Sequence, residues 1–107
     1  SDDLLPKVTP ELIANAGIVK AWQAWSKQVF AEGELSAVTK QLIAVAVAHV
    51  TQCPYCIKGH TKQALKAGAS EEQIMEAIWV AAEMRSGGAV AHSVVALSEM
   101  DLDTEGS

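Results

Sequence analysis

The sequence has few aromatic residues, no excess of basic charge and no long apolar run. Its 107 residues include three tryptophans, one tyrosine and one phenylalanine, too few for a large aromatic core. The formal net charge of −5 argues against binding to nucleic acid or to an anionic membrane surface. The apolar run Leu42–Val50 is too short to span a bilayer and contains a histidine. We therefore expect neither a nucleic-acid partner nor a membrane location.

The first residues, Ser1-Asp2-Asp3, are acidic, whereas a secretory signal peptide begins with basic residues. This favours a cytoplasmic protein. In that compartment two cysteines separated by two residues are more often catalytic or metal-binding than a structural disulfide.

The pattern of apolar residues predicts an all-α protein. Half of the residues are apolar, alanine is abundant, and neither alternating strand-like segments nor an internal repeat is found. We expect one domain over residues 1–107, with its core in about residues 10–100. Helices are predicted at about residues 10–31, 37–51, 54–67, 71–86 and 89–100. Trp22, Trp25 and Trp79 are expected in the core or in a subunit interface.

Capping residues set these predicted ends. Thr9-Pro10 is typical of a helix start, and Ser36 can cap the second helix. Gly68 suits the position just after a helix, and Ser70-Glu-Glu-Gln73 is a capping box. Gly87-Gly88 is expected to break or kink the fourth helix.

The most specific feature is the stretch HVTQCPYCIKGH, residues 49–60, which holds both cysteines. Pro54 fits the first turn of a helix, where no backbone N–H is needed. This places Cys53 near the N-cap and Cys56 at the third helical position, at the start of a central helix. Unpaired N–H groups and the positive end of the helix dipole favour a thiolate there. The pair is therefore predicted to be reactive, and helix placement activates either sulfur.

Two histidines flank the pair. His60 follows Cys56 by four residues, so it shares a helix face with that sulfur and can exchange a proton with it. His49 precedes Cys53 by four residues and is expected to point toward the same place, although a histidine on an apolar helix is often a core residue.

Residues 35–93 resemble the AhpD-like alkylhydroperoxidase branch of the carboxymuconolactone decarboxylase family. The resemblance rests on the apolar helix 42–50, on Cys53-Pro-Tyr-Cys56-x3-His60, on Ala64-x3-Gly68-Ala69 and on the following helix start. It implies an all-helical fold with AhpD-like topology that assembles into a homotrimer or homohexamer. The decarboxylases of the family lack the cysteine pair, so the resemblance implies peroxide reduction instead.

By this resemblance, Cys56 attacks the hydroperoxide, Cys53 resolves the sulfenic acid into a disulfide, and His60 relays protons. A lipoyl or thioredoxin-type dithiol would then reduce the disulfide. One position departs from the family pattern: Gln41 stands where AhpD has a proton-transferring glutamate. An amide cannot take over proton transfer, so a weak activity is expected.

Two residues could replace the missing acid. Gln41, Val45, His49 and Cys53 are spaced by four, so His49 could act beside the dithiol. Glu83 follows Trp79-Val-Ala-Ala and could orient His60 or His49 if it is buried. The other interpretation of Glu83 is an ion pair between helices or subunits, and Glu34 is a less favoured acid.

Three functions follow from these residues. The first is a peroxiredoxin-type antioxidant oxidoreductase that uses Cys53, Cys56, His60, His49 and Glu83 and needs no flavin, haem or metal cofactor. The second is a tetrahedral metal site made by the two cysteines with His49 and His60. The third is a non-catalytic, oligomeric redox sensor.

Overall fold

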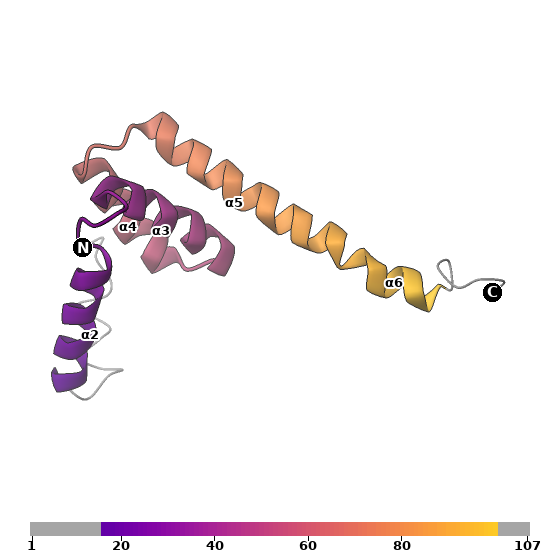
Figure 1. The fold of residues 1–107 in the computed structure, drawn as a ribbon, viewed down its shortest axis with the longest axis horizontal. Helices are drawn as coiled ribbons and strands as arrows, with labels where there is room; N and C mark the ends of the chain where they lie inside the picture. Colours follow the sequence, from indigo (N-terminus) through magenta and orange to yellow (C-terminus); the bar gives the residue numbers. More distant parts are fainter. Residues whose placement is uncertain (1–15, 101–107) are drawn as a thin grey trace.

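The computed structural model describes residues 16–100, and every regular element in this range is a helix. The helices are α2 (Ala16–Val29), α3 (Ala37–Thr51), α4 (Pro54–Lys66), α5 (Glu71–Ala91) and α6 (Ser93–Glu99). The all-α prediction is confirmed (Figure 1). The predicted helix start at Thr9-Pro10 lies outside the described residues.

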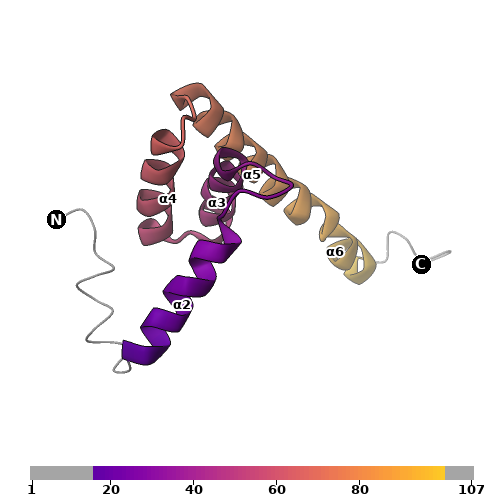
Figure 2. The same cartoon turned by 60° about the vertical axis from the view of Figure 1, so that its left-hand side comes forward.

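Helix α3 lies at the centre of the packed part and contacts both α4 and α5 (Figure 2). The buried cluster between these helices consists of Val45, Ala64, Ala69 and Ile74. Val45, Ala64 and Ile74 come from α3, α4 and α5, and Ala69 lies in the connection between α4 and α5. Two of the four members are alanines, so the buried core is small.

Short local signals set the ends of the central helices. Ser36 and Ser70 accept hydrogen bonds from the backbone N–H groups of Thr39 and Gln73, and Gln73 returns a bond to complete the predicted capping box. Helix α4 ends at Lys66, close to the predicted Ala67, and Gly68 follows with φ +107°. Such a backbone angle favours glycine. These predictions of the helix ends are confirmed.

The predicted break at Gly87-Gly88 is wrong. Helix α5 continues through both glycines to Ala91, and the chain bends only at His92 before α6. A glycine inside a helix costs about 1 kcal/mol relative to alanine, which weakens a helix without ending it. Neither glycine has the positive φ that would end the helix.

The tryptophans do not enter the core of the single chain. Trp22 and Trp25 are 50% and 61% exposed on α2, and Trp79 is 70% exposed on α5. Of the two places predicted for them, the core of the single chain is therefore wrong, and a subunit interface stays a prediction. Helix α2 ends at Val29, two residues before the predicted Ala31.

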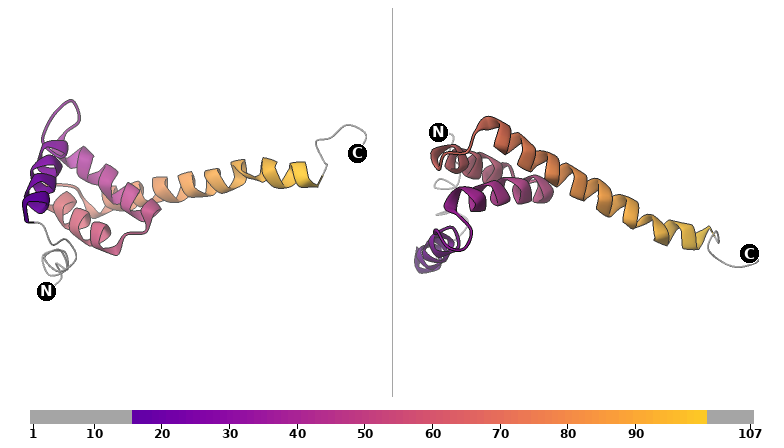
Figure 3. Two further views of the ribbon diagram at one scale, coloured as in Figure 1. Left: turned by 90° about the horizontal axis from the view of Figure 1, so that it is seen from below. Right: turned by 45° about the horizontal axis from the view of Figure 1, so that its top comes forward.

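The arrangement of the helices is open. The first part of α5 lies against α3, with Arg85 as a late contact, and the end of α5 extends away with α6 (Figure 3). The Cα radius of gyration is 19.2 Å, whereas a compact chain of this length has about 13 Å. Within residues 16–100, no helix combines the length and apolar character needed to cross a membrane.

The core can be tested with two valines of α3. Val45 is fully buried and Val47 is 51% exposed. We expect Val45→Ala to lower the free energy of unfolding by about 2 kcal/mol, because it removes buried methyl groups and leaves a cavity. Val47→Ala should cost less than about 0.5 kcal/mol. Urea unfolding at one fixed protein concentration measures both. Equal losses would contradict the described core.

Candidate active site

The two cysteines begin α4 as the sequence predicts. Cys53 is the N-cap, and its Sγ accepts a hydrogen bond from the backbone N–H of Cys56 at 3.2 Å. Pro54 occupies the first turn, where its missing N–H leaves no acceptor unsatisfied. Cys53 and Cys56 are joined in a disulfide, with their Cα atoms 5.2 Å apart. The structure therefore represents the oxidised state of the pair.

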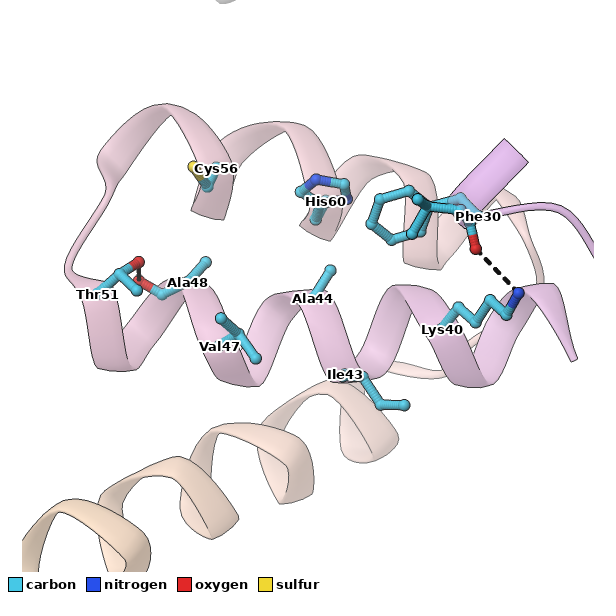
Figure 4. A pocket seen from close by; sticks show the side chains of 10 residues that line it. Phe30, Lys40, Ile43, Ala44, Val47, Ala48, Thr51, Cys56 and His60 are labelled. Carbon is cyan, nitrogen blue, oxygen red and sulfur yellow. Dashed lines mark hydrogen bonds between the residues drawn. The ribbon is translucent and has the colours of Figure 1, made fainter. Parts of the chain in front are cut away.

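Cys56 is the more accessible cysteine: its residue is exposed, whereas Cys53 is half-buried. In Figure 4 the side chains of Cys56 and His60 both stand on α4, on the wall of one hollow that α3 closes on the other side. The four-residue spacing places them one helical turn apart on the same face. His60 therefore shares with Cys56 both a helix face and the hollow beside it.

Two contacts hold the imidazole of His60. Its Nδ1 lies 2.8 Å from Oε1 of Gln41 on α3, and its ring stacks on Phe30 with the ring centroids 4.9 Å apart. An amide oxygen only accepts hydrogen bonds, so Nδ1 carries the proton and Nε2 has a free lone pair. Burial lowers the pKa of His60 from its ordinary value of 6.5, because an imidazolium is poorly solvated there. His60 is therefore held as a neutral base near pH 7.

Two hollows meet at Cys56 and His60. The first, called here the α3–α4 cavity, has a volume of about 410 Å³ and an almost wholly apolar lining. Its wall includes Phe30, Lys40, Ile43, Ala44, Val47 and Ala48 as well as Cys56 and His60 (Figure 4). Ala44 and Ala48 point from α3 toward α4, and their small side chains leave this space open.

The second hollow, called here the α2–α4 groove, has a volume of about 550 Å³. It is lined by both cysteines, and its walls carry Trp22, Trp25 and Tyr55 together with Lys58 and Lys62. The α3–α4 cavity, in contrast, reaches Cys56 and not Cys53. Cys56 thus lines both hollows, whereas Cys53 lines the α2–α4 groove alone.

His49 does not line either hollow. Its Nδ1 lies 2.7 Å from the carbonyl oxygen of Val45, one turn back on its own helix. The spacing of four placed His49 and Cys53 on one face, but α3 ends at Thr51 and Gln52 adopts a left-handed conformation with φ 58°. The chain changes direction there, so Cys53 does not continue the α3 face. That part of the spacing argument is wrong.

Glu83 is exposed on α5, and no aspartate or glutamate lines either hollow within the described chain. The Glu83 carboxylate extends along its own helix, where Oε2 lies 3.9 Å from the position a Cβ would take on Gly87. Glu34 is also exposed, before α3. The structure thus brings Gln41, and neither acid, to His60.

The four predicted metal ligands do not converge. Among residues 16–100 no three histidine, cysteine or acidic side chains are grouped closely enough to hold a metal ion. His49 is turned toward Val45, and His60 is bound to Gln41. This donor set does not fit a tetrahedral ion, which needs four converging ligands.

Three residues near the site were not predicted. Phe30 stacks on His60, Lys40 bonds the end of α2, and Arg85 on α5 donates to the carbonyl of Val50 at 2.6 Å. The last two bonds join residues 11 and 35 positions apart. No rule based on spacing along a helix connects residues so far apart. The one hint in the sequence was that Lys40 stands next to Gln41, a residue of the predicted site.

Comparisons with known proteins agree with this geometry. The model of the carboxymuconolactone decarboxylase family matches residues 16–99. An uncharacterised protein encoded in the cox locus of Paracoccus denitrificans is 58% identical over 94% of this chain and 95% of its own length. An uncharacterised protein of Cupriavidus necator is 35% identical over 82% of this chain and 78% of its own length.

Two further relatives extend the comparison. The alkyl hydroperoxide reductase AhpD of Mycobacteroides abscessus is 30% identical over 76% of this chain, a match that spans 37% of AhpD. A crystal structure of a protein from Methanobacterium thermoautotrophicum superposes with a TM-score of 0.76 and 29% identity, over 87% of this chain and 98% of that one. The chain therefore belongs to the carboxymuconolactone decarboxylase family.

Proposed function

We propose that this protein is a thiol-dependent peroxidase that reduces organic hydroperoxides through a Cys53/Cys56 dithiol–disulfide cycle. The observation that carries the proposal is the position of Cys56 and His60 together on the wall of an apolar cavity, with Cys53 within bonding distance of Cys56. The similarity to AhpD supports the same chemistry.

The proposed reaction begins at Cys56. His60 accepts the thiol proton at Nε2, and the Cys56 thiolate attacks the terminal oxygen of ROOH. The O–O bond breaks, Cys56 becomes a sulfenic acid, and His60 returns the proton to the leaving alkoxide, which departs as ROH. The Cys53 thiol then attacks the sulfenic sulfur, and its proton leaves with the hydroxyl group as water. The product is the Cys53–Cys56 disulfide.

Accessibility supports Cys56 as the attacking cysteine. Only Cys56 of the pair lines the α3–α4 cavity, which has the apolar surface that an alkyl group would occupy. Cys53 is half-buried, and its Sγ accepts the backbone N–H of Cys56, a position suited to resolving. His49 and Glu83 take no part in this scheme, because neither reaches the cavity.

Gln41 cannot transfer protons, but its bond to His60 fixes the tautomer that leaves Nε2 free. Since no carboxylate of residues 16–100 lines either hollow, His60 acts in this scheme without an acidic partner. We therefore expect slower turnover than in relatives that have a glutamate at this position.

The α2–α4 groove is the proposed entry for the reductant, because both sulfurs line it. A dithiol of the lipoyl or thioredoxin type would attack the disulfide, form a mixed disulfide, and release the Cys53 and Cys56 thiols as its own second sulfur closes the ring. The groove has space beside the two sulfurs for such a group.

We further propose a homotrimer or homohexamer. Support comes from the apolar side chains exposed along α5 and α6. A monomeric protein rarely exposes so many large apolar side chains to water, and association with other copies would bury them. These side chains are Trp79, Val80, Met84, Val90, Val94 and Val95, all at least 60% exposed.

The role of each cysteine can be tested by mass spectrometry on reduced protein treated with one equivalent of cumene hydroperoxide. The wild type should lose two hydrogens and both free thiols. Cys53→Ser should gain one oxygen on Cys56, because the sulfenic acid cannot be resolved, whereas Cys56→Ser should leave the peroxide unconsumed. A sulfenic acid found only in Cys56→Ser would reverse the assignment, and untouched wild-type thiols would refute the peroxidase proposal.

The role of His60 predicts a pH dependence. His60 accepts a proton only when neutral, and because burial lowers its pKa it stays neutral to a lower pH than an ordinary histidine. Gln41→Glu places a carboxylate beside Nδ1–H, which favours the imidazolium and raises the pKa, so the acid limb of the oxidation rate should move to higher pH. Stopped-flow oxidation of reduced protein measures the profile.

Two controls accompany that measurement. Gln23→Glu adds the same charge at an exposed position of α2 and should leave the profile unchanged. His60→Ala should slow oxidation on the order of a hundredfold, because it removes the base. An unshifted profile in Gln41→Glu would contradict the described pairing.

The assembly can be tested by sedimentation equilibrium at micromolar concentration. We expect a mass three or six times that of the 11.3 kDa chain. A monomer with unchanged helical content would refute the proposed oligomer.

A further inference from the structure

We propose that Lys40 is a positioning residue for His60: it anchors the turn that carries Phe30 and so holds the phenyl ring against the imidazole. For its effect on catalysis this inference rests on the proposed function. The placement of the ring can be tested without it.

The anchoring consists of two hydrogen bonds. The Lys40 ammonium donates to the carbonyl oxygen of Val29 at 2.9 Å and to that of Ala31 at 2.8 Å. These carbonyls stand on either side of Phe30, so one side chain fixes the main chain before and after this residue. Figure 4 shows the bond to Val29 beside the Phe30 ring.

The end of a helix needs such a partner. The last carbonyls of α2 point beyond its final turn and have no intrahelical N–H to bond, and the helix dipole makes that end negative. A lysine ammonium has three donors and a positive charge, so it satisfies both requirements. Lys40 also lines the α3–α4 cavity, while its ammonium bonds the turn.

Two adjacent residues of α3 therefore hold the imidazole from different directions. Gln41 accepts from Nδ1 and fixes one edge of the ring. Lys40 acts through Phe30, whose ring lies against the face of His60 at an interplanar angle of 28°. An edge and a face together define the plane of the imidazole, and hence the direction of Nε2. The stacked ring also excludes water from His60.

Lys40 could also act on His60 by its charge alone. Besides His60, the charged or titratable side chains that line the two hollows are Lys40 from α3 and Tyr55, Lys58 and Lys62 from α4. The two cysteines also line the α2–α4 groove, but in the oxidised protein they are joined in the disulfide. The end of α2 presents Phe30, which is neutral. The test must therefore separate an effect through Phe30 from a direct repulsion by the ammonium.

The test is a double-mutant cycle on the oxidised protein, read by NMR titration of the His60 ring, with His49 and His92 as internal references. Lys40→Met and Phe30→Leu should each raise the pKa of His60 toward its ordinary value, since each lets water reach the ring. If Lys40 acts through Phe30, the double variant should match Phe30→Leu alone. Lys40→Arg, which keeps a charge and several donors, should behave as the wild type.

Two outcomes would overturn the proposal. An unchanged titration in Lys40→Met would show that the anchor does not position the ring, and strictly additive shifts in the double variant would show a charge effect alone. Lys20→Met, which removes an exposed lysine of α2, is the matched control and should change nothing. If Lys40→Met does not fold, Lys40→Gln, which retains donors without the charge, takes its place in the cycle.

Kinetics then connect the anchor to catalysis. We expect Lys40→Met to slow oxidation of Cys56 by on the order of tenfold, within the hundredfold that misplacing a catalytic group can cost. The titration requires no peroxide, so a wild type that fails to reduce peroxide would refute the proposed function and leave the positioning result intact.

Discussion

The turn between α3 and α4 is the constraint on which the site depends. Gln52 takes a left-handed conformation with φ 58°, the only positive φ outside glycine in residues 16–100, and Cys53 then caps the next helix. The backbone N–H of Cys53 still bonds the carbonyl of Ala48, so α4 starts directly against the end of α3. This tight reversal makes α3 and α4 neighbours and places the dithiol at their junction.

The same helix pair supplies both the core and the site. Val45 and Ala64 pack tightly and bring α3 and α4 together, whereas Ala44 and Ala48 leave room opposite Cys56 and His60. Ala64 therefore gives close contact with Val45, whereas Ala44 and Ala48 line the cavity that also reaches Cys56 and His60. The abundance of alanine in the sequence thus explains the thin core and the apolar cavity together.

Local chemistry could be predicted from the sequence, and long-range contacts could not. Pro54 after Cys53, Ser36, and Ser70 with Gln73 each act within one helical turn, and each lies as expected. The position of His49 was wrong because one residue, Gln52, redirects the chain, and a glutamine carries no signal for a left-handed turn. Phe30 stacks on His60 from the segment after α2, and Lys40 of α3 bonds the carbonyl beyond Phe30, so only the folded chain reveals these contacts.

The disulfide joins residues three positions apart, within the first turn of a single helix. A crosslink that closes a short loop restricts the unfolded chain less than one that closes a long loop, so this disulfide stabilises the fold less than a bond between distant segments would. It also ties no two helices together, since α3, α4 and α5 are held by Val45, Ala64 and Ile74. Breaking the disulfide would therefore remove no covalent link between helices, and the buried cluster that joins α3, α4 and α5 does not include the cysteines.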